Sequence, residues 1–162
     1  MAQHRHRGLV LFGLLAVSTC VPAPTPQAIL PHPPYRQDVV PEWLALDWPK
    51  NAGCVAAPAS ETLPAGTLID RFGNEYGSYF SPRGESFAAR SLPYVCSQTA
   101  YTVYRVTTPL HVLTCKTMPW FGEPGGATQY KTDAPAMTLR QEGAIEPVPD
   151  AGSKPCEAAS VR

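Results

Sequence analysis

From residue 67 onward, hydrophobic and polar residues alternate in short runs that are separated by glycine and proline. Alternation with a period of two is typical of strands that bury one face, and these runs are rich in the β-branched and aromatic residues that strands favour. In the clearest run, residues 101–106, the odd-numbered side chains would share one face and the even-numbered ones the other. The pattern predicts five strands, over residues 67–70, 78–80, 101–106, 111–116 and 128–131.

One helix is expected after the last of these strands. Asp133 can cap its start, and Pro135 suits the first turn because proline there gives up no hydrogen bond. Met137 and Leu139 would face the core, and Gly143 would end the helix. Many short strands with one helix predict an α+β fold, a small domain dominated by an antiparallel β-sheet.

The first 23 residues have the pattern of a secretory signal peptide. A short basic stretch at residues 4–7 precedes residues 8–17, which are almost wholly apolar and too few to span a bilayer. Cleavage after Ser18 and cleavage after Ala23 both satisfy the small-residue rule. Residues 17–20 also weakly resemble a bacterial lipobox, which leaves a lipid anchor open. We therefore expect a secreted or cell-surface protein without a transmembrane segment.

Proline is concentrated before the predicted strands. Residues 22–64 hold ten of the nineteen prolines of the chain, and proline at this density removes backbone donors and disfavours regular helix or sheet. Residues 24–62 are therefore expected to form a proline-rich N-terminal arm. Because exposing Trp43 and Trp48 to water would be costly, residues 39–48 are expected to lie against the domain.

The five cysteines indicate disulfides. If Cys20 leaves with the signal peptide, an even set remains, and in an oxidising compartment it predicts a disulfide-stapled domain with two bridges in one of three pairings. Each bridge is expected to join a flanking cysteine, Cys54 or Cys156, to a central one, Cys96 or Cys115. Zinc is disfavoured because the chain has no CxxC pair, so no metal site is expected.

Charge and histidine content argue against several functions. The thirteen basic and thirteen acidic residues balance, whereas a nucleic-acid-binding protein normally has a basic excess. After signal removal the histidines are His32 and His111, and no serine has the glycine pattern of a nucleophile elbow, so a serine–histidine–aspartate relay is disfavoured. The chain has neither a GxGxxG fingerprint nor a GxxxxGK loop, which argues against a Rossmann fold and a P-loop.

Four short segments follow one another in a fixed order: LIDRFG at residues 68–73, SYFSP at 78–82, RSLP at 90–93 and PWFGEPGGATQY at 119–130. Together they resemble the tuberculosis necrotizing toxin (TNT) domain and the related fungal cell-surface NAD glycohydrolases. The resemblance covers residues 63–148 and implies a TNT-like fold there. Residues 149–162 then form a C-terminal tail.

The resemblance also implies a substrate site. In the family, the arginine of DRFG, an aromatic residue eight positions later and the glutamine of GGxxQY line the substrate cleft. They correspond to Arg71, Tyr79 and Gln129, which we expect to be catalytic. Planar guanidinium groups suit the two charges of a pyrophosphate. The expected substrate-binding residues are Arg90, Phe80, Trp120, Gly125 and Gly126.

The implied reaction is hydrolysis of the nicotinamide–ribose bond of NAD⁺ to give ADP-ribose and nicotinamide. Nicotinamide is a cationic leaving group that departs neutral, so the cleavage needs no general acid, unlike hydrolysis of an ordinary glycoside. NAD⁺ would be the substrate, with NADP⁺ left open, and no cofactor is expected. An antitoxin or a second copy of the chain is left open as a partner.

The sequence departs from the family pattern at two positions and leaves two other functions open. The toxin has a further cleft histidine near the position of Thr102, and family members often have a third glycine where this chain has Ala127. An ADP-ribosyl-transferring toxin would need a catalytic glutamate, for which Glu123 is the candidate, although Gln129 occupies the signature position. The other alternative is a non-catalytic, disulfide-stapled binding module.

Overall fold

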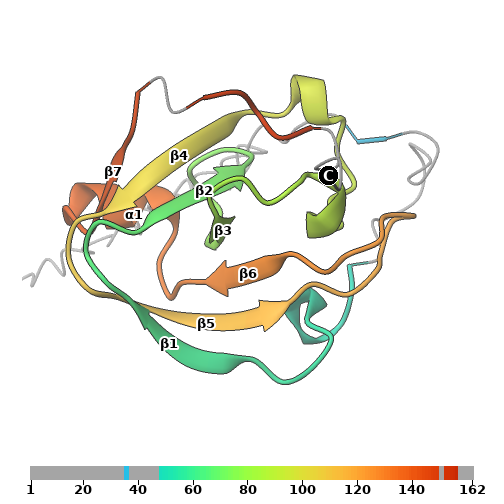
Figure 1. Ribbon diagram of the computed structural model, residues 1–162, viewed down its shortest axis with the longest axis horizontal. Coiled ribbons are helices and arrows are strands. Elements are labelled where there is room, and N and C mark those ends of the chain that lie inside the picture. Colours follow the sequence, from blue (N-terminus) through green and yellow to red (C-terminus); the bar gives the residue numbers. More distant parts are fainter. Residues whose placement is uncertain (1–34, 37–47, 150–151, 157–162) are drawn as a thin grey trace, which may run out of the picture. The chain divides into compact units, whose positions relative to one another are not determined.

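The computed structural model describes residues 35–36, 48–149 and 152–156, which contain a seven-stranded antiparallel sheet and one short α-helix (Figure 1). The spatial order of the strands is β1-β5-β6-β3-β2-β4-β7. The strands are β1 (Ala59–Leu63), β2 (Leu68–Phe72), β3 (Tyr79–Pro82), β4 (Tyr101–Val106), β5 (Leu110–Lys116), β6 (Thr128–Lys131) and β7 (Ile145–Pro147). The helices are α1 (Ala136–Gln141) and the 3₁₀ turns η1 (Asn51–Gly53), η2 (Ala88–Arg90) and η3 (Cys96–Gln98).

The expected α+β fold with a dominant antiparallel sheet is confirmed. All five predicted strands are present, and two of them, β4 and β6, have the predicted ends. The expectation that residues 24–62 contain no regular sheet is wrong for β1, which pairs with β5 from Ala59 opposite Thr114 to Leu63 opposite Leu110. The strand itself contains no proline, because Pro58 and Pro64 lie just outside its two ends. It also lies at the edge of the sheet, where neighbouring prolines are tolerated.

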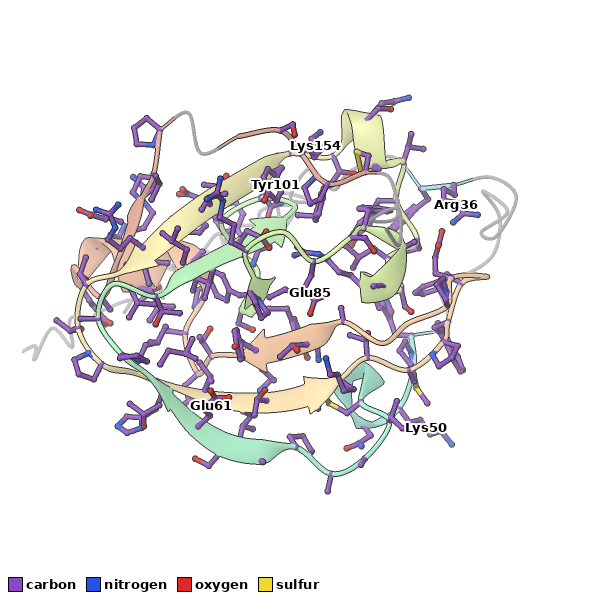
Figure 2. The ribbon with its side chains drawn as sticks, in the orientation of Figure 1. Arg36, Lys50, Glu61, Glu85, Tyr101 and Lys154 are labelled. Carbon is purple, nitrogen blue, oxygen red and sulfur yellow. A yellow bond between two sulfur atoms is a disulfide. The ribbon has the colours of Figure 1, made fainter. Side chains whose placement is uncertain are left out.

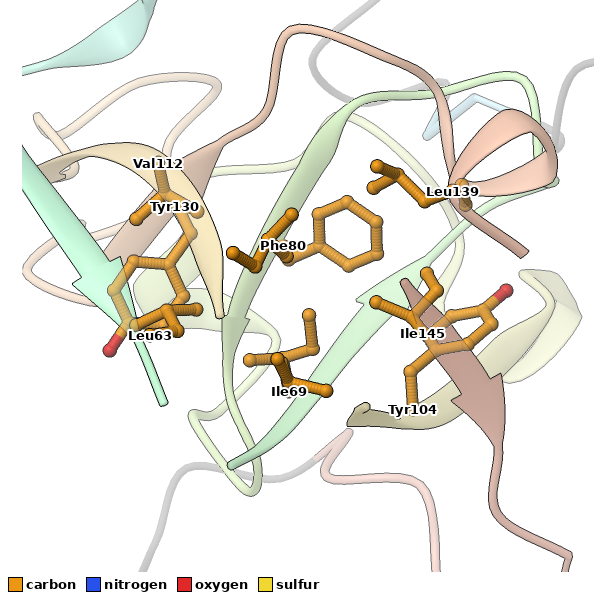
Figure 3. Close-up of a cluster of buried hydrophobic side chains, with 11 residues drawn as sticks. Leu63, Ile69, Phe80, Tyr104, Val112, Tyr130, Leu139 and Ile145 are labelled. Carbon is orange, nitrogen blue, oxygen red and sulfur yellow. The ribbon is translucent and has the colours of Figure 1, made fainter. Parts of the chain in front are cut away.

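One face of the sheet packs into the hydrophobic core, and we call it the core face. Ile69 of β2 lies opposite Tyr104 of β4, and Phe80 of β3 lies opposite Tyr130 of β6, so these side chains share that face. Figure 3 shows the resulting cluster, which α1 also contacts. Its members are Leu63, Ile69, Phe80, Tyr104, Val106, Leu110, Val112, Tyr130, Ala136, Leu139 and Ile145.

The opposite side of the sheet is called the Gln129 face. Because side chains alternate along a strand, it carries the neighbours of the core residues. Over β2 and β4 it is covered by Phe87, whose ring packs edge-on against Phe72. Over β5 and β3 it is open, since Leu113 is 41% exposed and Tyr79 is 42% exposed.

The start of helix α1 differs from the prediction. The N-cap is Pro135 rather than Asp133, and no side chain caps the helix. Backbone carbonyls of the loop before β3 perform this role, because the Ala136 and Met137 N–H groups donate to residues 77 and 75 respectively. Gly143, with φ of 71°, ends the helix as expected.

Two disulfides are present, Cys54–Cys115 and Cys96–Cys156. Each joins a flanking cysteine to a central one, as the sequence predicts. Lys154 also ties residues 152–156 to η3, because its ammonium donates to three backbone carbonyls of residues 96–99 (Figure 2). The two cysteines of each bridge are 61 and 60 residues apart along the chain, and a disulfide that closes a loop of that length stabilises the fold by about 4 kcal/mol.

Some expectations fall on residues that the structure does not describe. The signal peptide, and the arm up to residue 47 apart from residues 35–36, lie outside the described residues. Trp48 is described: it is 51% exposed and meets the ring of Phe121 edge-on, with 5.5 Å between ring centroids. Within the described residues, no helix is both long enough and apolar enough to cross a membrane.

Candidate active site

The register of the strands divides the expected catalytic residues between the two faces of the sheet. Gln129 lies opposite Cys115, and Tyr79 lies opposite Lys131, which places both on the Gln129 face. Arg71 alternates with the neighbouring residues of β2 and shares the core face with Phe80. The two groups meet at the start of β3, where Nη1 of Arg71 donates to the backbone carbonyl of Tyr79 at 3.3 Å.

Gln129 is anchored by its amide nitrogen. Nε2 donates to the carbonyl of Ala52 in η1 at 2.9 Å. Its carbonyl oxygen, Oε1, is not buried and has no hydrogen-bond partner among the described residues. A held amide nitrogen fixes the direction of the side chain, so the oxygen is a preoriented acceptor on the Gln129 face.

Arg71 is a buried cation without a counter-ion. Its exposed fraction is 6%, its Cζ lies 5.6 Å from the centroid of the Phe80 ring, and its Nε has no hydrogen-bond partner. No carboxylate of the described residues forms an ion pair with Arg71. The nearby Glu75 pairs with Arg140 instead. Burial lowers the pKa of the guanidinium, as expected when the charged form loses water.

Two tyrosine hydroxyls lie near Arg71 but do not balance its charge. Burial raises the pKa of Tyr94 to about 12 and also raises the pKa of Tyr104. Both hydroxyls are therefore neutral at physiological pH. An uncompensated buried charge is costly, so an anionic ligand that reached Arg71 would gain from neutralising it.

Arg90 is engaged by the protein itself. Its Nη1 lies 2.6 Å from a carboxylate oxygen of Asp70, and its Nε and Nη2 donate to the backbone carbonyl of Glu85. The guanidinium also lies over the Phe72 ring, with Cζ 4.9 Å from the centroid. Substrate contact by Arg90 stays a prediction, and in this structure the side chain stabilises the Gln129 face over β2.

Asp70, the acidic residue of the DRFG segment, was not predicted to have a role. Its exposed fraction is zero, and its carboxylate accepts hydrogen bonds from the Tyr101 hydroxyl at 2.7 Å and the Gly84 N–H at 2.9 Å. Burial, and then the hydrogen bond to Asp70, raise the pKa of Tyr101. The position of Asp70 next to Arg71 in the motif was the available signal, but its pairing with Arg90 depends on the fold.

Phe80 and Trp120 occupy different environments. Phe80 is 2% exposed and supports Arg71 from the core. Trp120 is half-buried beside Phe121 in the turn before β6, and Glu123 of the same turn forms an ion pair with Arg36. Substrate contact by either aromatic residue stays a prediction.

The double glycine allows a close backbone approach, and the approaching backbone belongs to the protein. A Cβ on Gly125 would lie 2.6 Å from the carbonyl carbon of Met118 and 2.7 Å from the nitrogen of Pro119. Gly126 donates its N–H to the carbonyl of Thr117 at 2.8 Å. Both glycines have positive φ, 70° and 94°, so the turn before β6 needs them for its own geometry.

Alanine substitutions at the two glycines are expected to differ in effect. Gly125→Ala combines an unfavourable φ with contacts of 2.6–2.7 Å to backbone atoms, and we expect a loss of about 3 kcal/mol or more in the free energy of unfolding. Gly126→Ala meets no atom within 4 Å, so it should lose only the strain term, about 1 kcal/mol. Urea denaturation of both variants measures the difference, and equal losses would contradict this account of the turn.

Glu85 is a second residue that the sequence did not single out. Its carboxylate accepts a hydrogen bond from the N–H of Thr128 at 3.0 Å, one residue before Gln129. Figure 2 shows Glu85 reaching from the segment after β3 towards β6. No local pattern could have indicated this contact, because the two residues are 43 positions apart.

Comparisons with known proteins support the sequence resemblance. The sequence model of a family described as Tuberculosis necrotizing toxin matches residues 62–148. The conidial surface nicotinamide adenine dinucleotide glycohydrolase nadA of Aspergillus fumigatus is 38% identical over 89 residues, which are 51% of this chain and 38% of the fungal protein. The chain therefore spans well under half the length of that relative.

A solved structure shares the fold. Tuberculosis necrotizing toxin, in the complex with its immunity factor IFT, matches with a TM-score of 0.52 at 20% sequence identity. The match covers 61% of this chain and 60% of the toxin chain. The expected TNT-like fold is confirmed.

Proposed function

The chain belongs to the tuberculosis necrotizing toxin family, and from this premise we propose that it is an NAD⁺ glycohydrolase. It cleaves the bond between nicotinamide and ribose and releases ADP-ribose and nicotinamide. The identity of 38% to a fungal protein named as such a glycohydrolase supports this reaction.

The observation that carries the proposal is the orientation of Gln129. Its Nε2 is held by Ala52, and its Oε1 is not buried and has no hydrogen-bond partner among the described residues. As the nicotinamide leaves, positive charge develops on the ribose, and a fixed carbonyl dipole stabilises that charge without reorganising. A neutral amide suffices, because the leaving group departs without being protonated.

Arg71 and Tyr79 act on the remote parts of the substrate. Arg71 brings an unbalanced positive charge, which suits the pyrophosphate of NAD⁺. Tyr79 offers an exposed ring on the Gln129 face, next to the carbonyl that accepts from Arg71. Binding energy from these groups orients the reacting bond beside Gln129.

We further propose that the protein acts outside the cell or at its surface. The signal-like segment at residues 1–23 supports export, and two disulfides persist in oxidising compartments. The toxin of similar fold forms a complex with an immunity factor, and an antitoxin protein is the corresponding partner class for this chain. Glu123 is paired with Arg36, which favours hydrolysis over transfer of ADP-ribose to an acceptor.

The test is release of nicotinamide from NAD⁺, or fluorescence from its etheno analogue, by the purified oxidised protein. Gln129→Ala is expected to lower turnover about 10- to 100-fold, as loss of a hydrogen bond to a charged group would. Gln141→Ala, an exposed glutamine at the end of α1, is the matched control and should retain full turnover.

Absence of turnover by correctly folded protein would refute the enzyme. ADP-ribose recovered on an acceptor protein instead of free in solution would indicate a transferase.

A further inference from the structure

The Cys54–Cys115 disulfide lies against the side chain of Gln129. Nε2 of Gln129 is 3.8 Å from the sulfur of Cys115 and 3.9 Å from the sulfur of Cys54. The register of β5 and β6 explains the contact, because Cys115 lies directly opposite Gln129. The disulfide therefore contacts the amide nitrogen that anchors the side chain.

The same amide nitrogen donates to the carbonyl of Ala52, which belongs to η1. All three residues of η1 have positive φ, at 55°, 54° and 77°, and a non-glycine residue in this region costs about 1–3 kcal/mol. Such a turn persists only if neighbouring contacts hold it. The Asn51 amide holds the turn locally, by donating to the carbonyls of residues 54 and 56. The contacts that hold the turn on the sheet are the disulfide at Cys54 and two backbone hydrogen bonds between residues 53–55 and residues 116–118.

We propose that the Cys54–Cys115 disulfide is a positioning element for Gln129, and that full hydrolytic activity requires this bridge. The proposal rests on the function proposed above for Gln129. The bridge fixes η1 on the end of β5, η1 presents the Ala52 carbonyl, and that carbonyl orients the amide. Without the bridge, η1 relaxes from its strained backbone and the amide loses its anchor.

The dependence links activity to the redox compartment. A dithiol or phosphine reductant breaks the sulfur–sulfur bond and is oxidised, while two electrons and two protons convert the bridge to two thiols. The chain would then have low activity in a reducing cytosol and full activity after export. A producing cell would thereby protect its own NAD⁺ before secretion.

The second disulfide supplies a matched control. Cys96–Cys156 joins η3 to residues 152–156 and has no contact with Gln129 among the described residues. It spans 60 residues against 61 for Cys54–Cys115, so both bridges constrain the unfolded chain equally. A difference in activity between the two disulfide variants therefore reports position and not loop closure.

The experiment is a mutant cycle on etheno-NAD⁺ turnover, below the unfolding temperature of every variant. Cys54→Ser/Cys115→Ser is expected to lose about tenfold in kcat, as expected for one misplaced hydrogen-bonding group, while Cys96→Ser/Cys156→Ser keeps the kcat of the unchanged protein. In a Gln129→Ala background, removing Cys54–Cys115 should cause no further loss. Equal losses in the two disulfide variants, or an independent loss in the Gln129→Ala background, would overturn the proposal.

A second readout does not depend on catalysis. The side-chain amide protons of Gln129, followed by NMR with ¹⁵N labelling, should exchange slowly in the oxidised protein because of the bond to Ala52. In Cys54→Ser/Cys115→Ser they should exchange like those of a free glutamine, while backbone signals of β4 stay dispersed. Unchanged exchange would overturn the positioning role even if the unmodified protein proved not to hydrolyse NAD⁺.

Discussion

Replacing Asp70 with alanine is expected to lower the free energy of unfolding by about 3–5 kcal/mol, the range for removing one partner of a buried ion pair. The carboxylate is fully buried and lies 2.6 Å from Nη1 of Arg90. It also accepts hydrogen bonds from Tyr101 and from the backbone of Gly84. Its removal leaves a buried guanidinium without a counter-ion and two donors without an acceptor. Urea denaturation of the oxidised protein measures the loss.

The control is the exposed ion pair between Arg105 and Glu146. Their side chains are 51% and 54% exposed and lie 3.5 Å apart, so Glu146→Ala should change stability by less than about 1 kcal/mol. Asp70→Ala and Arg90→Ala should each be costly, and the double variant should lose less than their sum, because each single change strands the other group. Additive losses would show that the pair is not a unit.

The strands that the sequence predicts best are those that carry buried apolar residues. β4 has the predicted ends, and three of its residues are buried: Val103, and Tyr104 and Val106, which pack in the core cluster. β1 carries no such signal, since four of its five residues are exposed. Its strand conformation comes from pairing with β5 at the sheet edge, a contact between residues about 50 positions apart.

The candidate site shows a similar division. The order of the motifs predicts Arg71, Tyr79 and Gln129 as site residues, but only strand register reveals that Arg71 projects from the opposite face. The anchor of Gln129 could not be predicted, because Ala52 has no side-chain chemistry and contributes only a backbone carbonyl. Likewise, the expectation that each disulfide joins a flanking cysteine to a central one left two pairings open, and the opposition of Cys115 to Gln129 appears only in the folded sheet.

Arg71 is expected to be the most sensitive position for activity, and Gly77 tests it indirectly. Arg71→Ala should lower turnover of etheno-NAD⁺ about 10²- to 10³-fold, as loss of a preorganised charged donor does. Gly77→Ala should approach this loss, because a Cβ there would lie 2.2 Å from Nη2 and 2.6 Å from Nη1 of Arg71. The backbone of Gly77 is outside the positive-φ region, so the effect comes from displacing the guanidinium.

A double variant separates displacement of Arg71 from damage to the loop. The close contacts of a Cβ at position 77 with the guanidinium should also lower the stability of Gly77→Ala. In Arg71→Ala/Gly77→Ala these contacts are absent, so this stability should be recovered while activity stays low. Thermal unfolding and etheno-NAD⁺ turnover measure the two quantities on the same samples. Full activity of Gly77→Ala would mean that the guanidinium can leave its buried position without loss of function, and Arg71 would then not be the group that binds the pyrophosphate.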